Sequence, residues 1–190
     1  LRALELETRG RDDFRLRFFS TDEGLRRDFE ISRGVIIPAG EYSFDEYELR
    51  LASGNQRRVS GSIELRGGDF YTGERTRTTV QVATRPSKHF RAAVEYEYND
   101  VTLPQGDFVV RLARVTLEAA FSATLSWVNL IQYDNVSETI GVNSRLHWVP
   151  RAGREGFLVL NHNLQDFDRD NDFHSTFSEA TVKFGYTFRF

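Results

Sequence analysis

The sequence predicts an all-β chain, folded as an antiparallel up-and-down transmembrane β-barrel. Apolar and polar residues alternate with a period of two along most of the 190 residues, and helical periodicity is nowhere sustained. Residues typical of turns separate the alternating runs. The final run, TVKFGYTFRF (181–190), carries apolar and aromatic residues on one side and polar residues on the other. Together these runs predict about eleven strands, most long enough for the ~9 to 11 residues of a tilted spanning strand.

The expected strands follow one another with no room for a second domain. The clearest alternation lies at 58–66, 90–99, 139–148 and 181–190. Weaker alternation places further strands near 3–9, 13–21, 42–52, 75–85, 108–121, 123–134 and 157–167. All four prolines lie at connections or strand ends, where the missing N–H breaks no hydrogen bond of a sheet. We therefore expect one β-barrel segment over 1–190.

Two kinds of connection alternate between these strands. Short turns are expected at 9–12, 53–56, 85–88, 121–123 and 150–154. Longer or more acidic links are expected at 23–40, 70–74, 100–106, 134–138 and 166–173. Bacterial barrels combine short periplasmic turns with longer outer loops, and they have an even number of strands. An odd count that ends at the periplasm predicts further strands before Leu1, so the segment is expected to be the C-terminal part of a longer chain and of a larger barrel.

A soluble barrel or sandwich is the main alternative, because its strands also have an inner and an outer face. Phe184, Tyr186 and Phe188 would then fill a protein core. The positions of the aromatic residues favour a bilayer instead, because they collect near strand ends as in the two interfacial girdles of a membrane barrel. The expected girdle residues are Trp127, Trp148, Tyr133 and Tyr98.

The polar face of the strands is expected to line a water-filled lumen. The expected lining residues are Arg58, Glu64, Arg66, Arg75, Arg77, Arg91, Glu95, Glu97, Arg145 and Lys183. Six arginines cluster on three consecutive strands and could bias a pore toward anions: Arg58, Arg66, Arg75, Arg77, Arg85 and Arg91. Alternatively, Glu64, Glu95 and Glu97 neutralise them in a plugged or tightly paired interior. The sequence leaves both possibilities open.

Composition excludes some classes of function. The net charge is −3 with acids and bases interspersed, so no general field attracts nucleic acid, and no nucleic-acid partner is expected. The chain has no cysteine, which excludes thiolate catalysis and zinc–thiolate sites. The mean hydropathy of −0.47 does not exclude a membrane barrel, because lipid-facing and lumen-facing residues average out.

Two groups of residues have side chains that could carry chemistry. Asp168, Asp170 and Asp172 have the carboxylate spacing of a calcium-binding loop, but Phe173 stands where that loop needs glycine. A solvated acidic loop is the simpler interpretation, so calcium is kept only as a weak candidate and no other cofactor is expected. Ser144 and His147 lie on opposite faces by parity, so the histidine cannot activate the serine. No catalytic residues are assigned, and the sequence gives no positive reason to expect an enzyme.

The last residues resemble a known assembly signal. Tyr186, Phe188 and the terminal Phe190 are similar to the C-terminal signature of bacterial outer-membrane proteins. That resemblance implies recognition by the barrel-assembly machinery, which adds the final strand to an open sheet edge.

Longer segments point to one family. FEISRGVIIPAGEYSF (29–44), GSIELRGGDFYTGER (61–75), LPQGDF (103–108), IQYDNVSETIGVNSRLHWVPRAG (131–153), FLVLN (157–161) and the terminal YTFRF resemble the barrel half of outer-membrane proteins with an N-terminal family-9-like carbohydrate-binding module. The resemblance implies a porin-like barrel in the outer membrane of a Gram-negative cell envelope. It brings no catalytic residues, since any carbohydrate role would belong to the upstream module.

The sequence therefore predicts an outer-membrane channel, or a membrane anchor for an upstream glycan-binding module. Its expected partners are the lipid bilayer, the barrel-assembly machinery, and possible small solutes or glycans. The alternatives are a structural or partner-binding barrel in an envelope complex and an outer-membrane barrel enzyme.

Overall fold

The computed structural model describes residues 2–187, and these form thirteen β-strands. The strand bounds are Arg2–Glu7 (β1), Asp13–Leu25 (β2), Phe29–Ser32 (β3), Val35–Ile37 (β4), Gly40–Ala52 (β5), Val59–Phe70 (β6), Gly73–Ser87 (β7), Phe90–Thr102 (β8), Phe108–Ser122 (β9), Leu125–Asp134 (β10), Thr139–Arg151 (β11), Arg154–Gln165 (β12) and His174–Tyr186 (β13). In this part of the chain there is no helix that is long and apolar enough to cross a membrane.

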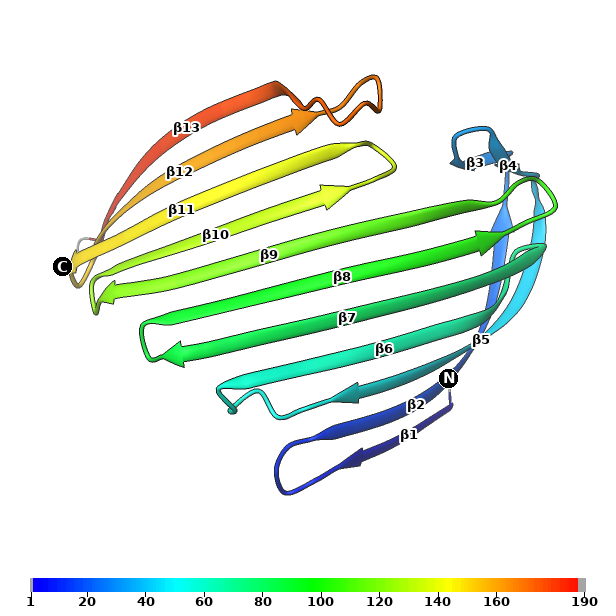
Figure 1. Cartoon of the computed structure of the whole chain (residues 1–190), viewed down its shortest axis with the longest axis horizontal. Helices are drawn as coiled ribbons and strands as arrows, with labels where there is room; N and C mark the ends of the chain where they lie inside the picture. Colours follow the sequence, from blue (N-terminus) through cyan, green and yellow to red (C-terminus); the bar gives the residue numbers. More distant parts are fainter. Residues whose placement is uncertain (1, 188–190) are drawn as a thin grey trace. The chain divides into compact units, whose positions relative to one another are not determined.

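Eleven of the strands form one antiparallel sheet in the order β1-β2-β5-β6-β7-β8-β9-β10-β11-β12-β13 (Figure 1). Every strand therefore pairs with its neighbour in sequence, apart from the small β3–β4 sheet between β2 and β5. The predicted all-β antiparallel meander is confirmed. Within residues 2–187 the sheet is not closed, because β1 and β13 form its two edges.

The structure adds to the predicted elements at two places. The expected link 23–40 contains β3 and β4, a hairpin that turns at Gly34, where φ is 77° and the Gly34 N–H donates to Glu30 at 2.8 Å. Strands of four and three residues are too short for a period of two to be recognised. The last strand begins at His174 rather than Thr181, and the predicted positions Phe188 and Phe190 lie outside the described residues.

The chain forms two compact units. The first comprises residues up to 81 together with 96–111, and the second comprises 82–95 together with residues from 112 onward.

In the first unit, the pairing of β1, β2, β5 and β6 sets two opposite faces. Directly opposed residues point to the same side of a sheet, so Leu4, Leu16, Leu49 and Leu65 form one continuous apolar row across four strands. Leu6, Phe14, Leu51 and Ile63 form the next row on the same side. We call this side the apolar face of the first unit, and much of it is exposed.

The residues between these rows form the charged face of the first unit. One row contains Glu5, Arg15, Arg50 and Glu64, and another contains Arg17, Glu48 and Arg66. Phe44 and Phe70 lie on the same side, because each is an even number of residues away from Glu46 or Arg66 along its strand.

The hydrophobic core of the first unit is small and lies on its charged face. It consists of Val35, Ile37, Phe44, Phe70, Val101 and Leu103. The β3–β4 hairpin contributes the first two of these residues, and the side chain of Ile37 is fully buried. The hairpin therefore covers one end of the charged face.

The second unit has the same two-sided construction but no comparable core. Leu146, Leu158 and Val182 form one apolar row across β11, β12 and β13, and Trp148, Gly156 and Phe184 form the next. Of the hydrophobic residues described in this unit, only Ala93 is buried. The opposite face carries polar residues such as Arg145, His147 and Lys183.

Candidate functional site

Glu46 is the centre of the charged face of the first unit. The β5 strand places it between Phe44 and Glu48, and its side chain is only 1% exposed. Its carboxylate accepts hydrogen bonds from Arg66 at 2.5 Å and from Nε of Arg75 at 3.0 Å. A buried carboxylate is costly unless it is paired, so the two guanidinium groups are what permit this position.

Aromatic rings hold the same two arginines from the other side. The guanidinium carbon of Arg66 lies 4.3 Å from the ring centroid of Phe19, and that of Arg75 lies 4.1 Å from the centroid of Phe70. Cation–π contacts of this kind stabilise a partly desolvated arginine. Phe70 is also a residue of the hydrophobic core, so its contact with Arg75 joins the Glu46 ion pairs to the core.

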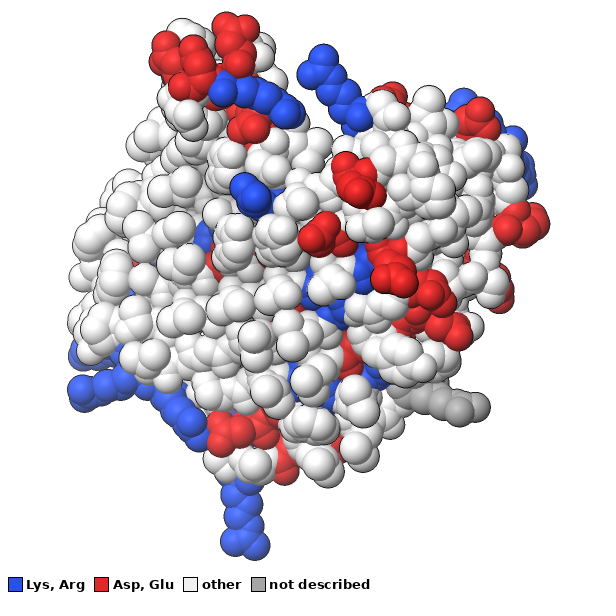
Figure 2. All heavy atoms as spheres, turned by 45° about the vertical axis from the view of Figure 1, so that its right-hand side comes forward, with Lys and Arg blue, Asp and Glu red and all other residues white. Residues whose placement is uncertain are grey.

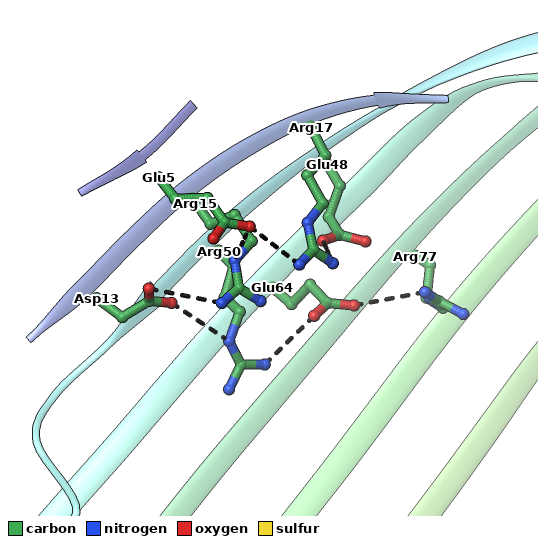
Figure 3. A network of polar contacts seen from close by, with 8 residues as sticks. All are labelled: Glu5, Asp13, Arg15, Arg17, Glu48, Arg50, Glu64 and Arg77. Carbon is green, nitrogen blue, oxygen red and sulfur yellow. Dashed lines mark hydrogen bonds and ion pairs between the residues drawn. The ribbon is translucent and has the colours of Figure 1, made fainter. Parts of the chain in front are cut away.

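A second network of ion pairs extends across β1, β2, β5, β6 and β7 (Figure 3). Glu5 pairs with Arg15 at 2.9 Å and with Arg17 at 3.2 Å. Arg17 also reaches Glu48 at 3.5 Å.

Arg50 extends this network to the next strands. It joins Asp13 at 3.9 Å to Glu64 at 3.4 Å, and Glu64 pairs in turn with Arg77 at 3.4 Å. The residues drawn in Figure 3 are four acids and four arginines, so this group has no net charge. The close spacing of both signs is also visible on the surface in Figure 2, beside broad areas of uncharged residues.

The β3–β4 hairpin is fixed to the sheet by polar contacts as well as by its core residues. The Ala39 N–H donates to Asp28 at 2.9 Å, and the Tyr42 hydroxyl donates to the Pro38 carbonyl at 2.7 Å. Gly106 has a φ of 143°, and a Cβ atom there would lie 3.1 Å from Cγ2 of Val35. Glycine at 106 therefore allows the β8–β9 link to approach the hairpin closely.

Tyr71, in the turn between β6 and β7, closes the edge of this core. Its ring packs against Tyr42, Phe44 and Phe70, and its hydroxyl donates to Glu23 at 3.0 Å. Burial and the adjacent Glu23 carboxylate raise the pKa of Tyr71 to about 12, because both disfavour the phenolate.

The charged face of the second unit carries fewer ion pairs. Arg91 pairs with Glu118 at 2.6 Å, and Arg114 pairs with Glu95 at 3.0 Å. His147 stacks on Phe157 with 4.2 Å between ring centroids and lies 3.2 Å from Glu155. Among the residues described, neither Arg145 nor Lys183 has an ion pair.

The predicted lining residues thus fall into three groups. Ion-paired lining residues in the strands are Glu64, Arg66, Arg75, Arg77, Arg91 and Glu95. Three further lining residues lie in strands but have no ion pair in the part of the chain that the structure describes: Arg145, Lys183 and Glu97. Arg58 was expected in a strand but lies in the turn just before β6.

Sequence reasoning missed most of the partners. These are Glu5, Asp13, Arg15, Arg17, Glu46, Glu48, Arg50, Arg114 and Glu118. Their alternation with apolar residues indicates the face on which they lie. The sequence does not indicate the strand register, which decides which acid pairs with which arginine.

The predicted girdle residues lie near strand ends. Trp127 and Trp148 are near the paired ends of β10 and β11 that lie away from the β10–β11 turn, and Trp148 is 49% exposed. Trp127 donates to Ser144 at 2.9 Å. Tyr133 is at the other end of β10, where its hydroxyl donates to Glu138 at 3.0 Å.

The fourth girdle residue, Tyr98, lies in β8 of the first unit. There it contacts the guanidinium of Arg111, whose central carbon is 5.8 Å from the ring centroid.

The acidic link 166–173 is organised by Asp166, a residue not singled out from the sequence. Its carboxylate accepts backbone N–H bonds from 168, 169, 170 and 171, at 2.7 to 3.3 Å. Burial opposes ionisation, but these four donors outweigh it and lower the pKa of Asp166. Across residues 2–187, Asp168, Asp170 and Asp172 do not form a group that could hold a metal ion.

The strand register also separates the histidine and serine considered for catalysis. Ser144 lies opposite Asn129 and Leu160, whereas His147 lies opposite Ser126 and Phe157. The two side chains are an odd number of residues apart on one strand, so they point to opposite faces. This arrangement cannot act as a nucleophile and its base.

Comparison of the chain with protein-family models, curated proteins and solved structures gives no match.

Proposed function

We propose that this chain forms part of the wall of an outer-membrane β-barrel, with its apolar faces against lipid and its charged faces toward the interior. The observation that carries the proposal is a sheet whose large apolar side chains remain uncovered in both units. Leu4 is 52% exposed and Phe184 is 77% exposed, and whole rows of neighbours accompany them. Soluble proteins rarely leave such surfaces in water, whereas a membrane barrel requires them.

Within that barrel, we propose the role of a membrane anchor or narrow channel for an upstream glycan-binding module. The ion pairs of the first unit favour the paired-interior alternative over a wide anion-selective pore, since three of the arginines predicted to line it, Arg66, Arg75 and Arg77, have acidic partners. The β3–β4 hairpin supports the same proposal, because it covers part of the charged face.

Insertion into a bilayer is tested with one substitution on each face. Leu49→Arg introduces a charge into the leucine row, where an arginine near the bilayer midplane costs about 2 to 4 kcal/mol. Ser62→Arg, on the charged face of the neighbouring strand, is the matched control. We expect Leu49→Arg alone to lower the folded fraction of the full-length protein in lipid vesicles. Equal tolerance of both substitutions would contradict the assignment of the apolar face to lipid.

Single-channel conductance of the full-length protein distinguishes the channel role from the anchor role. If the interior conducts, Arg75→Gln with Arg77→Gln should change the ion preference of the current. If no current is seen while the protein inserts, the anchor role is supported. An unchanged ion preference in a conducting protein would count against the assignment of these arginines to the lining.

The unpaired edges favour a second candidate, a barrel completed by other strands in an envelope complex. Edge strands in a bilayer need a hydrogen-bonding partner, and within residues 2–187 neither β1 nor β13 has one on its outer side. The chain has no cysteine, so single cysteines at Leu6 and Val182 provide a clean test. A disulfide between the two introduced cysteines supports self-closure, whereas a thiol-to-amine crosslink from either cysteine to another protein supports the complex.

A further inference from the structure

A cleft of about 560 Å³ lies at the turn between β11 and β12 of the second unit. Its lining residues are Trp148, Pro150, Arg151, Arg154, Glu155, Phe184, Gly185 and Tyr186. Apolar and aromatic groups occupy the part toward the strands, and two arginines occupy the part toward the turn. This arrangement combines a surface for hydrocarbon with a site for an anion.

Arg151 and Arg154 are directly opposite each other across the β11–β12 pair. Like charges in that position destabilise a sheet unless something neutralises them. Neither arginine has an acidic partner among the residues that the structure describes. Glu155 is engaged elsewhere, since its carboxylate lies 3.2 Å from Nε2 of His147 on the charged face.

Tyr186 orients one of the two guanidinium groups. It lies directly opposite Arg154 on β13, with the guanidinium carbon 5.0 Å from its ring centroid and Nη2 at 3.4 Å from its hydroxyl. A guanidinium held in this way still has further N–H groups that can donate, and the N–H groups of two arginines match a phosphate.

The row beyond the arginines is aromatic. Trp148, Gly156 and Phe184 are opposite one another, and a Cβ atom at position 156 would lie 3.2 Å from the Phe184 ring. Glycine at 156 therefore lets the Phe184 ring approach β12 closely. The leucine and valine row continues from there along the apolar face.

We propose that this cleft binds an anionic phospholipid, with the phosphate between Arg151 and Arg154 and one acyl chain along Trp148 and Phe184. The inference rests on the proposed membrane function and extends it by naming a lipid class. Charge complementarity selects the headgroup, because neither arginine has an ion pair among the described residues. The aromatic row selects a ligand with a hydrocarbon tail over a free phosphate.

The test measures lipid retained by the full-length protein in native mass spectrometry. The protein is exchanged into mixtures of phosphatidylglycerol and phosphatidylcholine with the same acyl chains. We expect the wild type to retain phosphatidylglycerol preferentially. Arg151→Gln with Arg154→Gln should lower that preference by about tenfold or more, in line with the loss of charge-assisted hydrogen bonds. Arg154→Lys should lose part of the preference, since it keeps the charge and loses the planar fork.

Matched controls separate the site from general charge. Arg9→Gln with Arg11→Gln removes the same charge from another short turn and should leave the preference unchanged. Trp148→Ala with Phe184→Ala should reduce retention of both lipids. Glycerol phosphate without acyl chains should not compete.

Three results would overturn the inference. They are an unchanged preference in the Arg151 and Arg154 double variant, an equal loss in the Arg9 and Arg11 control, and full competition by glycerol phosphate. If the protein fails to insert into bilayers at all, the proposed membrane function fails first. Insertion without a lipid preference would remove only the present inference.

Discussion

Glu46 accepts a hydrogen bond from Nε of Arg75 at 3.0 Å, while the Arg75 guanidinium rests on the ring of Phe70. The least exposed acid among the described residues is thus joined through one arginine to the hydrophobic core. Polar pairing and apolar packing support each other at this point of β5.

Glu46→Ala should therefore destabilise the protein strongly. Removing the acid leaves Arg66 and Arg75 facing each other without a counter-charge, and breaking a buried ion pair costs about 3 kcal/mol or more. The measurement is the free energy of unfolding in lipid vesicles. Glu41→Ala, at an exposed position of the same strand, should change it little. Similar effects of the two substitutions would show that the pairing of Glu46 adds no stability.

The β3–β4 hairpin offers an internal comparison of two adjacent isoleucines. Ile37 is fully buried and Ile36 is 47% exposed. Ile37→Ala should cost about 3 kcal/mol through the cavity it leaves, whereas Ile36→Ala should cost little. Trypsin cleavage after Arg33, in the exposed hairpin turn, reports the loosening of the hairpin. Equal cleavage rates in both variants would contradict the role of Ile37 in fixing the hairpin.

The raised pKa of Tyr71 predicts a loss of stability at high pH. The folded protein holds the phenol protonated up to about 12, whereas an unfolded tyrosine ionises near its ordinary value of 10.0. The stabilisation of the folded state by the protonated Tyr71 phenol is therefore complete below pH 10, and it is lost as the pH rises through the folded pKa of about 12. Stability measured across this window should fall less steeply in Tyr71→Phe. The ultraviolet absorbance of tyrosinate checks the pKa directly, with Tyr96→Phe as a control.

The lowered pKa of Asp166 gives the opposite dependence in the β12–β13 link. The ionised Asp166 stabilises the link fully when the pH is above 3.8, the ordinary pKa of aspartate. This stabilisation is lost as the pH falls through the lower pKa of Asp166 in the folded protein. Asp166→Ala should open the link at neutral pH, because four backbone donors lose their acceptor. Trypsin cleavage after Arg169 measures the opening. Asp168→Ala should leave the cleavage rate unchanged, and an equal increase would show that Asp166 has no special role.

Alternation along the sequence was sufficient to predict most strands and the faces of their residues. The leucine row through Leu16, Leu49 and Leu65 follows from period two once the strands pair. Local patterns carry no information about which residues of neighbouring strands stand opposite each other. Glu46 could therefore be placed in a strand from sequence, but not beside Arg75.

The hairpin escaped prediction for a different physical reason. Its burial depends on Val101 and Leu103, which are distant in sequence, and not on any pattern within 29–37. The four carboxylate contacts of Asp166 were likewise invisible, because an Asx-type turn leaves no periodic signal.

The composition of the core also determines the sequence of folding steps in the first unit. Apart from β2 and β5, which the segment containing β3 and β4 joins, neighbouring strands of the meander are linked by short connections and can pair early at little entropic cost. Ile37 reaches its final surroundings only after β8 has delivered Val101 to the same place. We therefore expect β3 and β4 to settle late, over a charged face whose ion pairs have already formed.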